Sequence, residues 1–440
     1  MPNWFRSIFK SNSHQILGKS LFWLGSAQII GRVVRLVSSI IIARLLTPEN
    51  FGEVAIILTS FELISTPLRR LTTAPLVKLS DDDFRQALTN ANKINWLSSI
   101  AAFIVMSLLS LVLSHFYQNT DFVLPMIFMA CSYLILPLGK LHVAFNLRQN
   151  RMRVVGRAVL WQTLLDGVFT AILALIGFGI WAIIIPKVLV TFVWVFIHTY
   201  KNPLPRQKTQ EKKEYINPPP LKAHSSNALL KFGLPVSISD IALAARQNID
   251  YLLIGYFLGV EALGIYFFAF NTSLGISLGL IQSYGVALYS HLCKPSEESL
   301  HIKFQQSLKF ILLLTIPLIT LQASLSPWYV PLIYGEKWVE AGALPVFILL
   351  CLSGLVRPLG EAASQYLISS GRTQLNLKAN LILTLLLIIS ISFASFWGLT
   401  AIACASLICY CITLPTFTYF LIKQQDKQTN ALKKELPNDA

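Results

Sequence analysis

Long apolar stretches recur along the chain from about residue 20 to residue 422, and short polar or Pro- and Gly-containing segments separate them. A helix needs about 20 consecutive apolar residues to cross the hydrocarbon core of a bilayer, and most of these stretches approach or exceed that length. The pattern therefore predicts twelve membrane-spanning helices. Their expected ranges are 20–46, 51–68, 94–114, 122–146, 158–177, 179–199, 229–257, 262–289, 310–325, 342–368, 379–396 and 399–422.

A polar segment halfway along the chain divides the predicted helices into six and six. Residues 201–228 contain three consecutive prolines and charges of both signs, a composition typical of a flexible cytoplasmic linker. The expected organisation is an N-terminal bundle at 1–200, this linker, a C-terminal bundle at 229–422 and a cytoplasmic tail at 423–440.

The two halves share a weak internal similarity. When the second half is shifted back by 212 residues, Glu261 and Gly264 fall on Glu49 and Gly52, although chance matching of apolar sequence is an alternative explanation. Each half holds an even number of spans, so both begin on the same side of the membrane, and a repeat would have its axis along the membrane normal. The predicted fold is an all-α integral membrane protein of about 12 transmembrane helices, in two six-helix bundles related by a pseudo-twofold along that normal.

Composition excludes the soluble classes of protein. Hydrophobic residues make up 54% of the chain, and charged residues make up 13%, about half of the roughly 25% found in soluble domains. A water-soluble fold could not bury so much apolar surface. Soluble enzymes and nucleic-acid-binding proteins are therefore ruled out, and the six cysteines, which show no disulfide spacing, are interpreted as packing residues.

The net charge of +15 is interpreted first as evidence of how the chain is oriented in the membrane, and not as evidence of an anionic partner. Of the 36 Lys and Arg residues, 28 lie in the N-terminal segment, in alternate loops and in the tail, whereas the opposite loops hold only Lys337. Lys and Arg accumulate in the cytoplasmic loops of membrane proteins. Both termini are therefore expected in the cytoplasm.

A polar stripe on the first span is the main candidate for binding an anionic substrate. Its members lie at helical spacing on one face: Gln28, Arg32, Arg35 and Ser39. A guanidinium group is permanently charged and forked, which suits a phosphate or diphosphate. The alternative is that these arginines pair with Glu62 or Asp250 and hold helices together.

Other charges inside the predicted spans are harder to assign. On the seventh span four polar residues share about a third of the helix circumference: Asp240, Arg246, Gln247 and Asp250. Arg246 and Asp250 are four residues apart, so the alternative to a role in a cavity is that they neutralise each other. On the tenth span Arg357 and Glu361 are also four residues apart, beside Pro358, and a structural ion pair is the favoured interpretation.

The fourth and sixth spans each carry one lysine. Lys140 and His142 point about 200° apart on a helix, so at most one of them faces a shared cavity, and Lys140 is the chosen candidate. Lys187 is expected to extend its ammonium group toward the membrane surface.

No motif indicates a catalytic, cofactor or metal site. Residues 81–83 are three consecutive aspartates, and such a cluster holds metal-bound nucleotide sugars in glycosyltransferases, but a solvated charge run is favoured because no soluble catalytic domain surrounds it. The chain also lacks the GxxxxGK[ST] phosphate-binding loop. No ATPase activity, metal or cofactor is therefore expected.

Two sequence stretches resemble the bacterial polysaccharide flippases. The first is Ile42-Ala-Arg-Leu-Leu-Thr-Pro-Glu-Asn-Phe-Gly-Glu-Val-Ala55, and the second is Asp250-Tyr-Leu-Leu-Ile-Gly-Tyr-Phe-Leu-Gly-Val-Glu-Ala-Leu-Gly-Ile-Tyr266. That family is the polysaccharide transporter branch of the multidrug/oligosaccharidyl-lipid/polysaccharide exporter (MOP) superfamily. The resemblance covers the whole chain in span count and the motifs cover about 30 residues.

The resemblance implies a bacterial inner-membrane protein that is not an enzyme. Such proteins move an undecaprenyl-diphosphate-linked oligosaccharide from the cytoplasmic to the outer leaflet, for capsule, O-antigen, teichuronic-type or other exopolysaccharide assembly. In the family the first, second, seventh and eighth helices line a cationic cavity. Carried over by span order, this assigns Arg32, Arg35, Glu62, Arg246 and Asp250 to the cavity, with Asn271 and Gln282 as sugar contacts. Basic residues outnumber acidic ones only slightly within the spans, which puts a strongly cationic cavity in doubt.

Three other functions were weighed. A multidrug or metabolite antiporter of the same architecture would exchange its substrate for H⁺ or Na⁺ and would rely on the acids Glu62, Asp166 and Asp250. A membrane polymerase or ligase would need a larger outer loop than the one near residues 326–341, and a scaffold would not explain so many charges within spans. The expected partners are the lipid-linked oligosaccharide, membrane lipids and other polysaccharide-assembly membrane proteins, and no nucleic acid.

Overall fold

The computed structural model describes residues 31–435, apart from 32, 80, 150, 205–224, 293–299 and 371. All regular secondary structure in this part of the chain is helical. The chain forms two compact units, Met1–Asn248 and Ile249–Ala440. The all-α architecture predicted from the sequence is confirmed.

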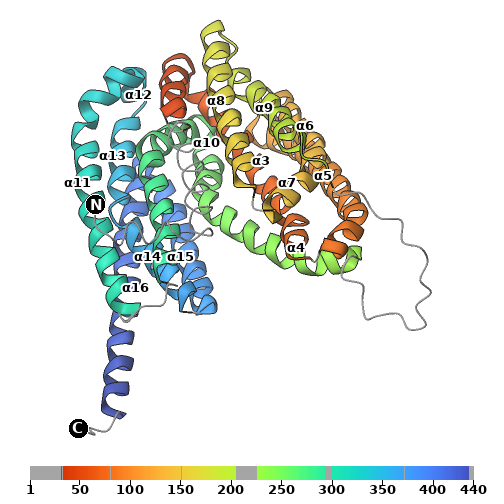
Figure 1. The fold of residues 1–440 in the computed structure, drawn as a ribbon. Coiled ribbons are helices and arrows are strands. Elements are labelled where there is room, and N and C mark those ends of the chain that lie inside the picture. The colour runs from red at the N-terminus through yellow and green to blue at the C-terminus, as the bar shows by residue number, and fades with distance from the viewer. Residues whose placement is uncertain are drawn as a thin grey trace, which may run out of the picture. The chain divides into compact units, whose positions relative to one another are not determined.

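The first unit contains the helices that correspond to the first six predicted spans (Figure 1). They are a helix over residues 33–45, α3 (Pro48–Arg70), α4 (Thr73–Lys78), α5 (Asp81–Tyr117), α6 (Val123–Ile135), α7 (Pro137–Arg148), α8 (Met152–Ile176) and α9 (Trp181–Thr199). Local sequence sets their ends. Thr47 caps α3 by accepting a hydrogen bond from the Asn50 N–H at 3.3 Å, Pro48 occupies the first turn, and Gly177 ends α8 in the left-handed region at φ 92°.

The second unit follows α10 (Ser226–Leu292), which begins within the first unit. It comprises the rest of α10, α11 (Leu300–Tyr334), α12 (Lys337–Glu340), α13 (Ala343–Ser353), α14 (Arg357–Ser369), α15 (Thr373–Ala394), the 3₁₀ helix η1 (Ser395–Trp397) and α16 (Leu399–Glu435). Gly259, at φ 85° and ψ −176°, interrupts α10 and separates a helix over 226–258 from one over 260–292. Only glycine adopts such a conformation without strain, so this residue makes the turn between the seventh and eighth spans.

The first turns of α10 pack on other helices of the first unit, and the division between the two compact units falls inside α10, after Asn248. Asp240 Oδ1 pairs with Arg70 at 3.2 Å, and Ser237 Oγ donates to the Pro67 carbonyl at 3.0 Å. Leu229 is buried in a cluster that also includes Leu76. The seventh predicted span is therefore anchored to α3 and α4 before it enters the second unit.

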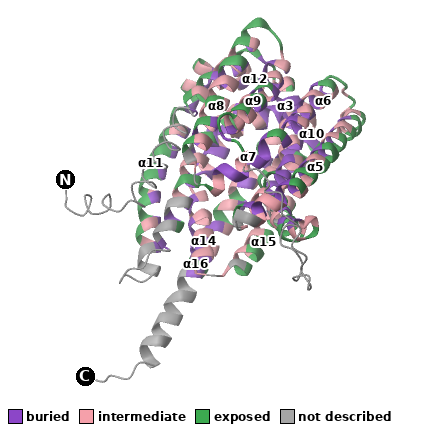
Figure 2. Cartoon of the chain, turned by 45° about the vertical axis from the view of Figure 1, so that its right-hand side comes forward, coloured by how far each residue is buried: buried purple, intermediate pink, exposed green. Residues whose placement is uncertain are grey.

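The helices have the length and apolarity that a bilayer requires. Among the described residues nine segments could cross a membrane, and the pair α6 and α7, bent by 50°, makes a tenth. One of the nine, Gln247–Gly275, includes the break at Gly259, and residues 33–45 belong to the predicted first span. Each predicted span thus coincides mainly with helix in the residues that the structure describes. Figure 2 shows exposed residues along α11 and α15, and these include large apolar side chains such as Leu313, Leu332 and Ile382. Such surfaces fit contact with lipid tails.

Aromatic packing holds the α12 end of the second unit together. Trp338 on α12 is fully buried and stacks on Phe268 with ring centroids 3.8 Å apart, and Tyr334 packs edge-on against Phe268 at 5.3 Å. Lys337 lies over the Trp338 ring, and its partial burial lowers the pKa of its ammonium from the ordinary value. The short α12 is therefore an anchored element between α11 and α13.

A close helix crossing lies between residues 33–45 and α8. Ser38 Oγ donates to the Gly167 carbonyl at 3.0 Å. A Cβ atom at Gly167 would overlap the Val34 side chain and approach Ser38 Oγ to 2.8 Å. Glycine at this position lets the first span approach the fifth.

We expect Gly167→Ala to destabilise the purified protein, because the added methyl group would force the first span away from α8, at a cost of roughly 1–3 kcal/mol. Thermal unfolding in detergent, followed by size-exclusion chromatography, measures this loss. Gly275→Ala is the matched control, since no heavy atom lies within 4 Å of its Cβ position, and it should leave the midpoint unchanged or slightly higher. Equal midpoints for the two variants would contradict this packing.

Candidate functional site

The predicted arginine stripe lies largely at the edge of the described chain. Gln28 and Arg32 are outside the described residues, as is the side chain of Arg246. Arg35 is exposed, and its Nε donates to the Gly31 carbonyl of its own helix at 3.2 Å. Its predicted role in substrate binding stays a prediction.

Glu62 pairs within its own helix. Its Oε2 lies 2.5 Å from Arg69 Nη2, and Arg69 also donates to Ser65 Oγ at 3.4 Å. Both charged side chains are substantially exposed. Arg35 is therefore not the ion-pair partner of Glu62 in this structure.

Asp166 forms an ion pair between two membrane helices. Its Oδ2 lies 3.2 Å from Lys187 Nζ, which joins α8 to α9. Its other oxygen, Oδ1, is buried without a hydrogen-bond partner in the described structure. Lys187 therefore serves as a counter-charge within the bundle, which sequence spacing did not reveal.

Lys140 lies inside the first unit. Its side chain on α7 is only 6% exposed, and its Nζ is 3.4 Å from Ser99 Oγ on α5. A large oligosaccharide has no direct access to a group enclosed in this way.

In the second unit Asp250 lies in an aromatic environment. Its Oδ2 accepts a hydrogen bond from the Tyr266 hydroxyl at 2.9 Å, and its Oδ1 accepts one from the Tyr251 backbone N–H at 3.0 Å. The Tyr251 ring packs against Tyr266 and Phe270 with centroids 5.9 and 5.4 Å apart. Residues on both sides of the Gly259 break in α10 therefore donate hydrogen bonds to the Asp250 carboxylate.

Arg357 approaches the same group from the start of α14. Its guanidinium lies over the Tyr410 ring of α16 at 4.6 Å and over the Phe270 ring at 5.7 Å. Its charge also acts on Asp250. We call these six residues the Arg357 cluster: Asp250, Tyr251, Tyr266, Phe270, Arg357 and Tyr410.

Glu361, the expected partner of Arg357, is held elsewhere. Its Oε1 accepts a hydrogen bond from Gln365 Nε2 at 2.8 Å, and it interacts electrostatically with Tyr284 of α10. A Cβ atom at Gly285 would lie 2.8 Å from the Glu361 carboxyl carbon. The described structure holds no ion pair between Glu361 and Arg357, because Arg357 is engaged by two aromatic rings instead.

The two predicted sugar contacts lie on α10 after Gly259. Asn271 and Gln282 are both exposed, and Asn271 Nδ2 donates to the Phe267 carbonyl one turn earlier at 2.8 Å. Eleven positions separate them in the sequence, which is about three helical turns. Asn271 also makes a side-chain hydrogen bond with Tyr251 of the Arg357 cluster, whereas Gln282 lies further along α10.

The Arg357 cluster can bind an anion. Aromatic faces on a guanidinium leave its N–H edge available for hydrogen bonding, and Arg357 Nε is buried without a partner in the described structure. A phosphate oxygen could accept from that edge in a setting with little competing water. Sequence analysis missed the contribution of Phe270 and Tyr410, because rings in an apolar helix give no signal that distinguishes them from core residues.

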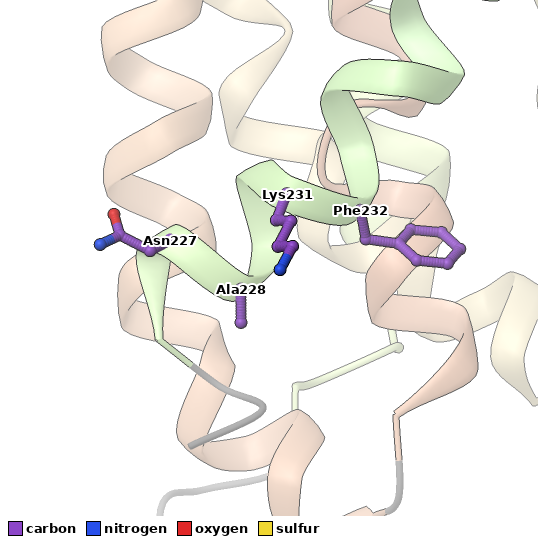
Figure 3. A pocket seen from close by; sticks show the side chains of 4 residues that line it. All are labelled: Asn227, Ala228, Lys231 and Phe232. Atoms are coloured by element: carbon purple, nitrogen blue, oxygen red, sulfur yellow. The ribbon is translucent and has the colours of Figure 1, made fainter. Parts of the chain in front are cut away.

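A pocket of about 380 Å³ lies beside the start of α10 in the first unit. Asn227, Ala228, Lys231 and Phe232 line it, and Figure 3 shows the Lys231 side chain between Ala228 and Phe232. None of the predicted site residues contributes to this pocket. It is therefore separate from the charged groups described above.

Comparisons with known proteins identify a family. Residues 41–343 match the family described as "Polysaccharide biosynthesis protein". The teichuronic acid biosynthesis protein TuaB of Bacillus subtilis is 24% identical over 302 residues, which is 67% of this chain and 59% of TuaB. The lipopolysaccharide biosynthesis protein WzxC of Escherichia coli is 27% identical over 161 residues, which is 36% of this chain and 32% of WzxC. The chain thus aligns with less than two thirds of the length of each relative.

Solved structures define the fold. The lipid II flippase MurJ, in an inward closed conformation, has a TM-score of 0.74 at 14% identity over 91% of this chain and 87% of MurJ. An inward-facing multidrug resistance transporter of the MATE family has a TM-score of 0.65 at 14% identity over 92% of this chain and 96% of that transporter. The chain therefore belongs to the polysaccharide biosynthesis protein family, and its fold is that of MurJ and of this MATE transporter.

Proposed function

We propose that this protein is a flippase for an undecaprenyl-diphosphate-linked oligosaccharide, which it moves from the cytoplasmic to the outer leaflet of a bacterial inner membrane. The observation that carries the proposal is the family match over residues 41–343. The names of the two relatives refer to teichuronic acid and lipopolysaccharide, and both are surface polysaccharides. The product is accordingly a capsule, O-antigen or related exopolysaccharide.

The physical task matches the fold. A lipid-linked oligosaccharide has a polar head that cannot enter hydrocarbon and a lipid tail that need not leave it. Two bundles that move by alternating access can carry the head through a wet interior while the tail stays in lipid. Neither step requires covalent chemistry, which agrees with a transporter that is not an enzyme.

The diphosphate is the part of the substrate that charged side chains recognise most strongly. In the second unit we assign this contact to Arg357, whose guanidinium is held by two aromatic rings and whose Nε has no other partner in the described structure. Arg32 and Arg35 of the first span, with Arg246, remain candidates for the same role. Asn271 and Gln282 remain candidates for sugar contacts.

We propose that an ion gradient drives export and acts through an acidic residue within the spans. Three candidates were expected, and each acid has a basic neighbour: Asp250 has Arg357, Glu62 has Arg69 and Asp166 has Lys187. A nearby base already compensates the carboxylate charge, so these acids have less need of a cation from solution. Glu361 has no basic partner within ion-pair distance in the described chain, and Tyr284 beside it has a buried, unpartnered hydroxyl. Glu361 is therefore the better candidate for binding a coupling cation.

The second candidate function is a multidrug or metabolite antiporter driven by H⁺ or Na⁺. It is favoured by the structural likeness to the MATE transporter, which shows that the same fold serves that activity. The two functions differ in what a deletion strain loses. A flippase deletion removes surface polysaccharide, whereas an antiporter deletion sensitises cells to toxic cations and leaves surface polysaccharide intact.

The proposed orientation places both termini in the cytoplasm. In a cysteine-free background, a membrane-impermeant thiol reagent added to intact cells should label single cysteines at Thr120 and Glu336 and should not label those at Gln149 and Gln374. All four residues are exposed and lie at or near helix ends, two on each expected side. Permeabilised cells provide the control, since all four sites should then react. Labelling of Gln149→Cys in intact cells would contradict the orientation.

Arg357→Gln should reduce export of the surface polysaccharide by about ten- to a hundredfold, because a charge-assisted hydrogen bond in a dehydrated site contributes roughly 1.5–3 kcal/mol. Arg357→Lys should restore export only in part, since lysine lacks the planar fork. Surface polysaccharide and the amount of protein in the membrane are measured together. Arg153→Gln, at an exposed arginine of α8, is the matched control and should be neutral. Normal export by Arg357→Gln, or an equal loss of protein and of export, would overturn the assignment.

Glu361→Gln should make export insensitive to the transmembrane ion gradient, because the neutral amide cannot bind a compensating cation. Export is followed in cells after collapse of the proton gradient or the sodium gradient in turn. The exposed Glu336→Gln variant should retain the wild-type response. If Glu361→Gln keeps the full response and Asp250→Asn loses it, the coupling acid is Asp250.

A further inference from the structure

A lysine without a counter-charge is enclosed in the first unit. Lys140 is 6% exposed, and the hydroxyl of Ser99, which is fully buried, is its one hydrogen-bond partner among the described residues. The ammonium group has three N–H donors, and the bond to Ser99 uses one of them, at the long distance of 3.4 Å. Two donors therefore remain in a dry environment.

The helices around α7 do not supply a carboxylate. α7 packs against α4, α5, α6, α8 and α9, and against the start of α10 at Leu229. The acids on α4 to α9 are Asp166 and the three aspartates at 81–83, and the first acid along α10, Asp240, is paired with Arg70. Asp166 is paired with Lys187. Asp83 is sixteen residues from Ser99 along α5, more than four helical turns or about 24 Å. The basic and imidazole groups on these helices, such as His142 and His198, cannot compensate a positive charge.

A second donor on the same face of α5 also lacks a partner. Asn95 lies one turn before Ser99 and is 1% exposed. Its Oδ1 accepts a hydrogen bond from the Thr72 hydroxyl at 2.7 Å, whereas its Nδ2 is buried and unpartnered in the described structure. Buried donors normally find an acceptor, and unpaired ones cost roughly 1–3 kcal/mol each. The arrangement thus offers donors and a positive charge with no protein acceptor to satisfy them.

We propose that Lys140, Ser99 and Asn95 bind a small inorganic anion within the first unit. An anion neutralises the ammonium and accepts hydrogen bonds without donating any, which is what this set of side chains lacks. The enclosure of all three residues excludes an oligosaccharide or a lipid headgroup. A single positive charge matches a monovalent ion, so chloride is the principal ligand and inorganic phosphate is the larger alternative. This site is distinct from the Arg357 cluster and does not depend on which substrate the protein carries.

Thermal unfolding of the purified full-length protein in detergent tests the site. Transfer from sodium gluconate to sodium chloride or sodium bromide should raise the unfolding midpoint by a few degrees in a saturable manner, because the ion binds the folded state. Lys140→Met and Asn95→Leu should lose this rise. Lys93→Met changes an exposed lysine of α5 and should retain it. A sodium phosphate series at equal ionic strength distinguishes the two anions.

The outcomes separate a bound anion from a structural lysine. A saturable rise in the native protein and in Lys93→Met, absent from Lys140→Met, supports the site. A halide response that persists in Lys140→Met, or its absence from the native protein for both chloride and phosphate, overturns it. If Lys140→Met does not yield folded protein, anomalous scattering from crystals of the native protein grown in bromide decides. A bromide peak beside Lys140 Nζ supports the proposal, and no peak there refutes it.

Discussion

The hydrocarbon core of a bilayer offers the chain no hydrogen-bond partners, and the rest of this structure depends on that constraint. Every backbone amide within the membrane must be satisfied by the segment itself, so the spans are helices. Irregular backbone occurs where it separates helices, as at Gly259 between the two parts of α10 and at Gly177 after α8. The same constraint applies to side chains, because each charge within a span needs a partner inside the protein.

The charges in the spans meet this requirement in different ways. Asp166 and Lys187 neutralise each other across two helices, and Glu62 finds Arg69 two turns along its own helix. Arg357 lies near the Asp250 carboxylate and is also held by two aromatic faces. Such an arrangement positions the guanidinium and leaves its Nε without a hydrogen-bond partner among the described residues, which suits a substrate that carries phosphate. A charged side chain with no oppositely charged neighbour is the one that a ligand of opposite charge would stabilise most.

α10 belongs to both compact units, and its first turns are part of the first unit. Its first turns are fixed to α3 and α4 by the Arg70–Asp240 pair and by the hydrogen bond from Ser237 to Pro67. Gly233 lies so close to the Leu71 backbone that a larger residue would displace it. The same helix then carries Asp250 into the second unit.

The sequence alone determined the all-α fold class and the approximate ranges of the membrane helices, because apolar stretches of membrane-spanning length dominate its pattern. It also supplied the residues that bear charge within those spans. Spacing along one helix could not determine which charges meet, since partners such as Lys187 and Asp166, or Arg357 and Tyr410, are contributed by different helices. Arg357 and Glu361 lie at the spacing of an ion pair, yet packing against Phe270 and Gly285 directs them apart. The enclosure of Lys140 likewise depends on how α5 and α7 pack, and only the tertiary structure decides how helices pack, because each helix face can pair with several others.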